Sequence, residues 1–252
     1  MTQDFTGRTV IVTGAAHGFG RAIAAAFAGR GAKVWACDVL AEELAETGRL
    51  IGPQGAVRAV DVTDRAAVQA LVAEAEAATG AIDVLVNNAG GVLGQVGRPI
   101  EEIGPEAWQG IFDVNLSGAF WCVQAVAPGM KRKSGGRIVN ISSGAGLGVS
   151  LTGIQAYASA KAGQIGLTRQ LAHELGAWGI TVNNVAPGFV RSNPTTERQW
   201  EAMGEAGQAR LMGSIALRRL GTVDDIANAV LFFASDSAGW ISGQVLSVDG
   251  GK

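Results

Sequence analysis

Short runs of apolar and β-branched residues alternate with alanine- and leucine-rich stretches along the whole chain, and this alternation restricts the possible folds more than any other feature. The apolar runs are nearly continuous, which is typical of strands buried on both faces. Strands that alternate with helices usually join a parallel sheet. The pattern therefore predicts an α/β doubly wound fold, a seven-stranded parallel sheet flanked by helices on both faces, with strands at 8–13, 33–38, 57–60, 83–87, 137–142, 181–186 and 244–248.

The spacing of these runs also predicts the domain organisation. One long interruption covers residues 188–221, where Asn193-Pro194 precedes a helical stretch of mixed polarity. Ligands of doubly wound folds bind at the carboxyl ends of the strands, where this segment begins. We expect one domain over residues 1–252, with 188–221 as a substrate-binding loop or lid. We also expect helices at 20–30, 41–50, 64–79, 154–176 and 223–235, and more than one helix through 103–131.

Charge and cysteine content argue against several classes of protein. The net charge of -2 gives no bulk attraction to nucleic acid or to anionic membranes, and no run approaches the roughly 18 apolar residues that a membrane span needs. The first residues do not resemble a secretory signal. Cys37 and Cys122 lie outside any CxxC or Cys/His cluster, and His17 and His173 lack metal-ligand spacing. We expect buried thiols, no metal and a cytoplasmic protein.

A glycine-rich turn, Thr13-Gly14-Ala15-Ala16-His17-Gly18-Phe19-Gly20, follows the first predicted strand and leads directly into a helix. Glycines there let the backbone approach a pyrophosphate, and a helix N-terminus offers free amides and positive potential. Such a string alone could be only a tight turn. Its position between a strand and a helix favours a dinucleotide site.

Asp38 ends the second predicted strand, where dinucleotide-binding folds place an acid that binds the adenosine ribose. A carboxylate at this point would repel a 2'-phosphate. The next residue is Val39 and the turn carries His17, so no arginine or lysine is placed to receive that phosphate. We expect NAD rather than NADP; the structural alternative is that Asp38 caps a helix.

The only tyrosine of the chain, Tyr157, precedes Lys161 by four residues in a predicted helix. Side chains at this spacing project from one face, so a phenol and an ammonium can address one small volume. A nearby positive charge favours the phenolate and lowers the tyrosine pKa. The pair fits proton transfer, although a half-buried tyrosine with a lysine beside it would look the same in the sequence.

Together these motifs resemble the short-chain dehydrogenase/reductase family, whose fold is Rossmann-like, and the resemblance covers essentially the whole chain. The motifs occur in the family's order: Thr13-Gly14 to Gly20, Asp61-Val62, Asn87-Asn88-Ala89-Gly90, Asn115, Ser142-Ser143, Tyr157 with Lys161, and Pro187-Gly188.

The resemblance implies a role for each motif. Tyr157 would be the acid/base, Lys161 would bind the nicotinamide ribose and lower the tyrosine pKa, Ser143 would bind the substrate oxygen, and Asn115 would hold a relay water. The cofactor would contact Gly14, His17, Gly18, Phe19, Gly20, Asp38, Val39, Asp61, Val62, Asn88, Ala89, Gly90, Tyr157, Lys161, Pro187, Gly188, Val190 and Ser192.

The serine departs from the family's pattern. Ser143 lies fourteen residues before Tyr157 instead of thirteen, so strict counting selects Gly144, which has no hydroxyl. We place the extra residue in the loop 144–154 and keep Ser143, because it follows the apolar strand 137–141 as the matching serine does. Ser142 is the alternative.

Several substrates remain open. Polar residues near the expected pocket favour a secondary alcohol or ketone of a small polar molecule, such as a sugar, sugar acid, polyol or hydroxy acid; these residues are Gln95, Gln155, Arg191 and Asn193, and the last three with Ser143 and Tyr157 are the substrate-binding candidates. The motifs also resemble NADPH-dependent 3-oxoacyl carrier-protein reductases, with Arg132, Lys133 and Arg169 as conceivable carrier contacts. An alternative of another class is a catalytically idle NAD-binding scaffold.

By resemblance we expect a homotetramer that packs through the helices near 116–130 and 157–175 and through the last strand.

Overall fold

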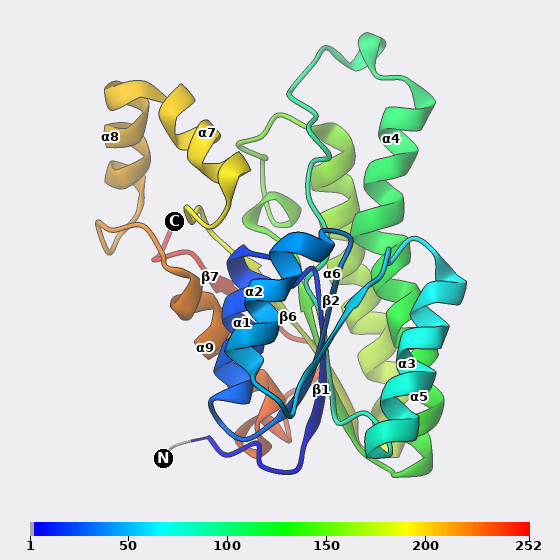
Figure 1. Ribbon diagram of the computed structural model, residues 1–252. Helices are drawn as coiled ribbons and strands as arrows, with labels where there is room; N and C mark the ends of the chain where they lie inside the picture. Colours follow the sequence, from blue (N-terminus) through cyan, green and yellow to red (C-terminus); the bar gives the residue numbers. More distant parts are fainter. Residues whose placement is uncertain (1–2) are drawn as a thin grey trace.

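A seven-stranded, all-parallel sheet forms the centre of the protein, of which the computed structural model describes residues 3–252 (Figure 1). The strands lie in the order β3-β2-β1-β4-β5-β6-β7. Their bounds are β1 Thr9–Thr13, β2 Lys33–Asp38, β3 Ala56–Ala59, β4 Val84–Asn87, β5 Gly136–Ile141, β6 Ile180–Pro187 and β7 Val245–Val248. The predicted fold class is confirmed. The order reverses between β1 and β4, which places the switch point of the sheet between the carboxyl ends of these two strands.

Helices cover both faces of the sheet because successive side chains of each strand point to opposite sides. Val10 and Val12 of β1 face one core, and Ile11 between them faces the other. The first core is covered by α1 (Gly18–Ala28), α2 (Ala41–Ile51) and α9 (Val223–Ala234). The second is covered by α3 (Arg65–Thr79), α5 (Gly118–Arg132) and α6 (Gln155–Leu175).

The helices predicted through 103–131 are α4 (Pro105–Phe112) and α5. They are joined by one π-helical turn at Asp113–Ser117, which was not predicted. Within this turn the side chain of Asn115 donates to the Ile111 carbonyl oxygen at 2.9 Å and to the Gly91 carbonyl oxygen at 2.9 Å. Single π turns of this kind occur frequently at functional sites.

Two helices, α7 (Pro194–Ala202) and α8 (Gly204–Ser214), form the excursion predicted between β6 and α9. They stand away from the sheet at its carboxyl edge (Figure 1). Asn193 begins α7 with a capping box, and Gly204 connects the two helices at a φ of +60°. A parallel bridge between Val190 and Gly221 closes the base of the excursion.

Within residues 3–252, no helix is long and apolar enough to cross a membrane, and no group of three or more His, Cys, Asp or Glu side chains could hold a metal ion. Cys37 and Cys122 are both free and buried. Burial raises the pKa of both thiols, that of Cys122 to about 12, so neither is a reactive thiolate at neutral pH.

Candidate active site

The glycine-rich turn after β1 is tied to the end of β4 by side-chain hydrogen bonds. The Thr13 hydroxyl accepts from the amides of Asn88 and Ala89 at 3.1 and 3.0 Å. The Asn88 side chain donates to the carbonyl oxygens of Thr13 and Gly14 at 3.0 and 2.8 Å. These bonds fix the turn at the switch point, where a dinucleotide would bind.

Two of the turn's glycines are required by packing and by backbone conformation. A Cβ at Gly14, whose φ is +64°, would stand 2.7 Å from the Ala89 Cα. At Gly18, with φ of +55°, it would stand 3.0 Å from the Ser192 carbonyl oxygen. The second contact brings the excursion against the turn. The first amides of α1 have no partner within the helix, so the turn presents donors that fit a pyrophosphate.

Asp38 lies at the end of β2 beside this turn. Its Oδ2 accepts from the Ala16 amide at 2.9 Å and its Oδ1 from the Leu40 amide at 3.1 Å, so the carboxylate is held by backbone groups. Val39 beside it is exposed. Arg21 is the cation that contacts the turn, and it donates to the Ala16 and Glu43 carbonyl oxygens.

The remaining adenosine-side candidates surround the same edge. His17 precedes α1 without a side-chain capping bond. Asp61 accepts from the amide and hydroxyl of Thr63, at 2.9 and 2.8 Å, and is exposed. Val62 is buried, and a Cβ at Gly118 of α5 would stand 2.7 Å from its Cγ2. Asp61 and Val62 therefore both make contacts within the protein, Asp61 with Thr63 and Val62 with Gly118.

The nicotinamide-side candidates continue from β6 into the excursion. Pro187 is the last residue of β6 and is buried. The Gly188 amide donates to the Val248 carbonyl oxygen at 2.9 Å. Val190 is buried, and the Ser192 amide donates to the Thr196 hydroxyl at 2.9 Å. This segment links the sheet to α7 and reaches the glycine-rich turn through Ser192.

Tyr157 and Lys161 lie on the first two turns of α6. Lys161 is only 3% exposed, and its Nζ donates to the Ile141 carbonyl oxygen at the end of β5, at 2.9 Å. Burial lowers the pKa of Lys161 from 10.5 to about 7. Its Nζ lies 5.8 Å from the centre of the tyrosine ring, so the two side chains share one region, as predicted from their spacing.

The pKa of Tyr157 moves in the direction opposite to the one predicted. Burial raises it above 10.0, and a hydrogen bond with Ser143 lowers it by less. Lys161 is not among the causes of this shift. The reason is physical: burial penalises the phenolate, while the lysine points at a carbonyl oxygen and is itself easily deprotonated.

The structure places Ser143 beside the tyrosine. Its side chain acts on the Tyr157 phenol by lowering the pKa of that group, and its hydroxyl accepts from the Ala145 amide at 3.1 Å. Ser142 points elsewhere, because its buried hydroxyl donates to Asn184 Oδ1 in β6. Gly144 is exposed and starts a short 3-10 turn. Among these three residues, Ser143 is the one whose side chain affects the pKa of the phenol.

Asn115 is fully buried near the lysine. Its Oδ1 accepts from the Gly91 amide at 3.0 Å, so the side chain binds backbone groups through both of its polar atoms. A Cβ at Gly90 would stand 2.5 Å from Asn115 Oδ1 and 3.2 Å from Lys161 Nζ. Glycine at position 90 therefore lets the chain after β4 pass over both side chains.

The polar residues chosen as substrate contacts all have partners within the protein. Gln95 donates to the Ala107 carbonyl oxygen and Gln155 to the Arg98 carbonyl oxygen. Arg191 binds Glu197 through two nitrogens, at 2.9 and 2.7 Å, and lies over the Trp200 ring. Asn193 caps α7. These contacts account for the polar side chains of all four residues without a bound substrate.

Comparison with known proteins identifies the family. A family model described as enoyl-(acyl carrier protein) reductase matches residues 14–252. The chain is 42% identical over 248 residues to the (2S)-[(R)-hydroxy(phenyl)methyl]succinyl-CoA dehydrogenase subunit BbsD of Thauera aromatica, covering 97% of this chain and 96% of the relative. It is 39% identical over 250 residues to the 3-oxoacyl-[acyl-carrier-protein] reductase FabG of Escherichia coli K12, covering 99% and 98%. A solved structure of a putative short-chain alcohol dehydrogenase from Sinorhizobium meliloti 1021 superposes with a TM-score of 0.89 at 37% identity, covering 98% and 97% of the two chains.

The chain belongs to the short-chain dehydrogenase/reductase family. Levodione reductase is a second solved relative, with a TM-score of 0.91 at 31% identity and 98% of each chain covered. This dehydrogenase/reductase is therefore an oxidoreductase of a family that binds a nicotinamide cofactor.

One part of the dehydrogenase/reductase site was not predicted from the sequence, a network of buried polar side chains next to the end of β5. In this network Asn87 donates to Asn140, Asn140 to Thr168, and Ser142 to Asn184. It fixes the end of β5, which carries both the Ile141 carbonyl oxygen and Ser143. Asparagines inside otherwise apolar strands were the available signal, since a buried amide needs hydrogen-bond partners.

Proposed function

We propose that this enzyme interconverts 3-oxoacyl and 3-hydroxyacyl thioesters by hydride transfer with a nicotinamide cofactor. The observation that carries the proposal is the placement of Ser143 beside the Tyr157 phenol, next to buried Lys161, in a chain of this family. The names of BbsD and FabG describe a 3-hydroxyacyl-CoA and a 3-oxoacyl carrier-protein substrate. A small polar substrate is less well supported, because its four predicted contacts are engaged within the protein.

Proton transfer would be carried out by Tyr157. Its raised pKa keeps the phenol protonated at neutral pH, so it can donate a proton to a carbonyl oxygen that becomes an alkoxide. The Ser143 hydroxyl would stabilise the same oxygen by a hydrogen bond. In the oxidising direction the phenolate would recover the proton, and Lys161 would stabilise it electrostatically. The bound cofactor supplies or accepts the hydride.

Lys161 and Asn115 would assist this proton transfer by holding the groups around Tyr157. The bond from Lys161 to the Ile141 carbonyl oxygen leaves other ammonium protons for the nicotinamide ribose. Both amide hydrogens of Asn115 are donated to the Gly91 and Ile111 carbonyl oxygens, and its Oδ1 accepts from the Gly91 amide, so its proposed contribution is to position the chain around Gly90.

We propose NAD as the preferred cofactor. Asp38 is fixed by two amides at the adenosine side, where a 2'-phosphate would meet its carboxylate. Within residues 3–252, Arg21 is the only cation hydrogen-bonded to the glycine-rich turn, and its donors are directed at the Ala16 and Glu43 carbonyl oxygens and at the Thr47 hydroxyl. The glycine-rich turn and the residues predicted from Pro187 to Ser192 would hold the rest of the cofactor.

The test is a reductase assay with 3-oxobutanoyl-N-acetylcysteamine and NADH or NADPH, followed by absorbance at the nicotinamide band, with a sugar and polyol panel assayed in the oxidising direction. We expect turnover of the thioester with NADH. Tyr157→Phe should lower kcat by at least about a hundredfold and leave NADH binding, measured by fluorescence, nearly unchanged. Turnover of polyols alone would return the assignment to small polar substrates, and NADH binding without any turnover would favour an idle scaffold.

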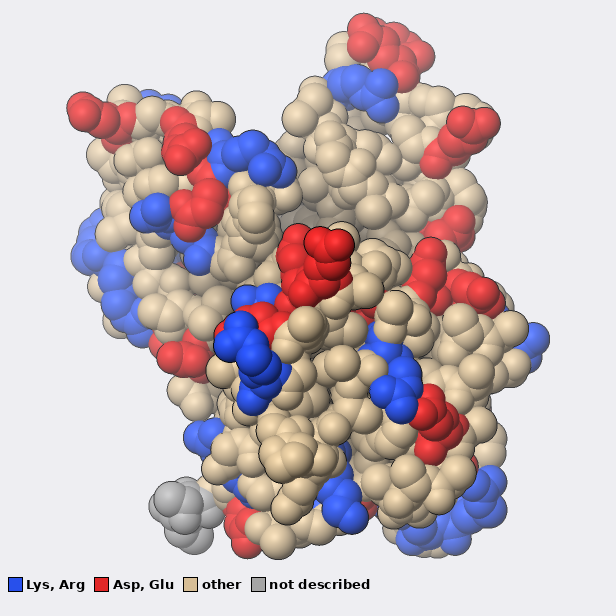
Figure 2. All heavy atoms as spheres, in the orientation of Figure 1, with Lys and Arg blue, Asp and Glu red and all other residues tan. Residues whose placement is uncertain are grey.

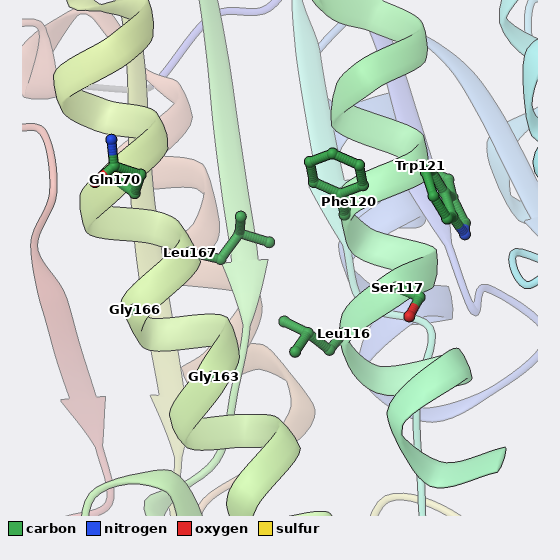
Figure 3. A pocket seen from close by; sticks show the side chains of 8 residues that line it. All are labelled: Leu116, Ser117, Phe120, Trp121, Gly163, Gly166, Leu167 and Gln170. Carbon is green, nitrogen blue, oxygen red and sulfur yellow. The ribbon is translucent and has the colours of Figure 1, made fainter. Parts of the chain in front are cut away.

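A homotetramer is proposed as the assembly. The outer face of α5 and α6 carries a shallow apolar groove between the helices, lined by Leu116, Ser117, Phe120, Trp121, Gly163, Gly166, Leu167 and Gln170 (Figure 3). No atom lies within 4 Å of a Cβ placed at Gly166, so another helix could approach closely there. Sedimentation should give four copies; a stable monomer would remove the proposal.

A further inference from the structure

Two segments at the carboxyl edge of the sheet expose aliphatic side chains. After β4, Leu93 is 58% and Val96 72% exposed; after β5, Leu147 is 51%, Val149 99% and Leu151 56% exposed. We call these five residues the apolar rim. Residues 89–97 and 143–154, which contain the rim, include no charged residue. A cluster of exposed aliphatic residues free of charge is uncommon on a soluble surface and usually marks a binding site.

The two halves of the apolar rim lie against each other. Gln155 donates to the Arg98 carbonyl oxygen at 3.1 Å, which joins the end of the first segment to the start of α6. The backbones of Gly97 and Gly153 are also in contact, since a Cβ added at Gly97 would stand 3.2 Å from the Gly153 carbonyl oxygen. The rim is therefore one surface built from two segments.

This surface is continuous with the catalytic side chains. Val92, next to Leu93, packs in a small cluster with Tyr157 and Ile154. On the other side, Ser143 caps the turn Gly144–Gly146, which leads directly to Leu147. Figure 2 shows a hollow between the α7–α8 excursion and the segment around α4, and most of its visible wall is uncharged.

The backbone holds part of the rim in an unusual conformation. Leu93 has a φ of +49°, one of three positive values among the non-glycine residues of 3–252. Side chains other than glycine rarely adopt this region, and such residues concentrate at binding sites. The leucine is turned outward beside the site instead of being packed in the core.

We infer that the apolar rim binds the uncharged group attached to the 3-carbon of the substrate, an alkyl chain or an aromatic ring, and selects substrates by the size of that group. The inference rests on the proposed function, which places the 3-oxygen between Tyr157 and Ser143. A group on the same carbon can then reach the rim past Val92 or Leu147. Because the rim has no charge, burial of apolar surface is the source of its selectivity.

The test is a chain-length series of 3-oxoacyl-N-acetylcysteamine thioesters from four to eight carbons, together with the 3-phenyl compound. These esters lack a carrier protein and phosphate, so carrier contacts cannot produce a trend. Complete burial of a methylene corresponds to about a fourfold gain, and we expect kcat/KM to rise about two- to threefold per methylene at this partly open surface. A flat series would overturn the inference and leave the proposed function standing.

A double variant and a matched control assign the trend to the rim. V149N/L151N should lower the ratio of kcat/KM for the eight-carbon over the four-carbon ester by about fivefold or more. Leu50→Asn, which changes a leucine of similar exposure on α2, should leave this ratio unchanged. An unaltered ratio in the double variant, or an equal fall in the control, would contradict the inference.

A binding measurement keeps the two proposals separable. Octanoyl-N-acetylcysteamine lacks the 3-oxygen and cannot react, so its affinity is measured by calorimetry whether or not the enzyme reduces any 3-oxoacyl thioester. We expect the wild type to bind it more tightly than butanoyl-N-acetylcysteamine, and V149N/L151N to lose this preference. Loss of turnover with retained preference would contradict only the proposed function; equal binding of the two esters would contradict the rim.

Discussion

Replacing Lys161 by methionine is expected to stabilise the cofactor-free protein at neutral pH. Methionine keeps most of the length of the side chain and removes a charge that is 3% exposed and has one hydrogen-bond partner, the Ile141 carbonyl oxygen. The wild-type lysine titrates near pH 7 when folded and near 10.5 when unfolded. Between these values the unfolded state binds more protons, so the wild type gains stability as the pH rises.

The magnitude follows from the two pKa values. One pKa unit corresponds to about 1.4 kcal/mol, so burying this lysine costs about 4 kcal/mol at pH 7 and about 2 kcal/mol at pH 9. Leaving the Ile141 carbonyl oxygen without its partner offsets about 1–2 kcal/mol of the gain. Lys161→Met should therefore be about 2–3 kcal/mol more stable at pH 7, and the advantage should shrink by about 2 kcal/mol at pH 9.

Urea unfolding followed by tryptophan fluorescence at pH 7 and pH 9, at one protein concentration, measures both quantities. Comparing the variant with the wild type cancels the titration of all other groups. Lys33→Met, at an exposed lysine of β2, is the control and should show no pH-dependent difference from the wild type. Equal stability changes at the two pH values, or a variant less stable at pH 7, would refute the reasoning from burial.

Two further predictions concern the serine pair and the acid of β2. Ser143→Ala should lower kcat for the 3-oxoacyl ester by about 10–100-fold, with little change in the free energy of unfolding. Ser142→Ala should lower the free energy of unfolding by about 1–3 kcal/mol, because buried Asn184 loses its donor. Steady-state kinetics and urea unfolding of both variants separate these effects, and a fully active Ser143→Ala variant would contradict the assignment of Ser143. Asp38→Ser removes the carboxylate at the adenosine side, so the ratio of kcat/KM for NADH over NADPH should fall by about tenfold or more; an unchanged ratio, measured by titrating both cofactors, would mean that Asp38 serves only the turn.

The periodicity of the sequence predicted the sheet because burial on both faces leaves a direct pattern. Strand β2 has the predicted bounds, Lys33–Asp38, since an apolar run ends there at a charged residue. The π turn between α4 and α5 could not be predicted in this way. The bonds that accompany the π turn join Asn115 to Gly91, in a segment that the sequence does not place beside it.

The four-residue spacing of Tyr157 and Lys161 predicted where the two side chains lie, but not the pKa of either group. Spacing of four residues fixes a shared helix face, whereas a pKa depends on burial and on every neighbouring group. The lysine is buried against β5, a strand distant in sequence, and that burial dominates its titration. The polar substrate contacts stay predictions for a similar reason: residue type identifies a possible donor such as Arg191, and only the fold shows that Glu197 accepts from it.

Three features that oppose stability lie at the carboxyl edge of the sheet. Lys161 is buried with a lowered pKa, Leu93 is held at a positive φ, and aliphatic residues such as Val149 stand in solvent. None of these is required by the doubly wound fold, whose cores are ordinary packed aliphatics on both faces. Departures from local rules that cluster at one edge are expected where a site has been selected for function at the expense of stability. On this reasoning the lysine and the apolar rim belong to one binding site, and substitutions such as Lys161→Met should raise stability while they remove activity.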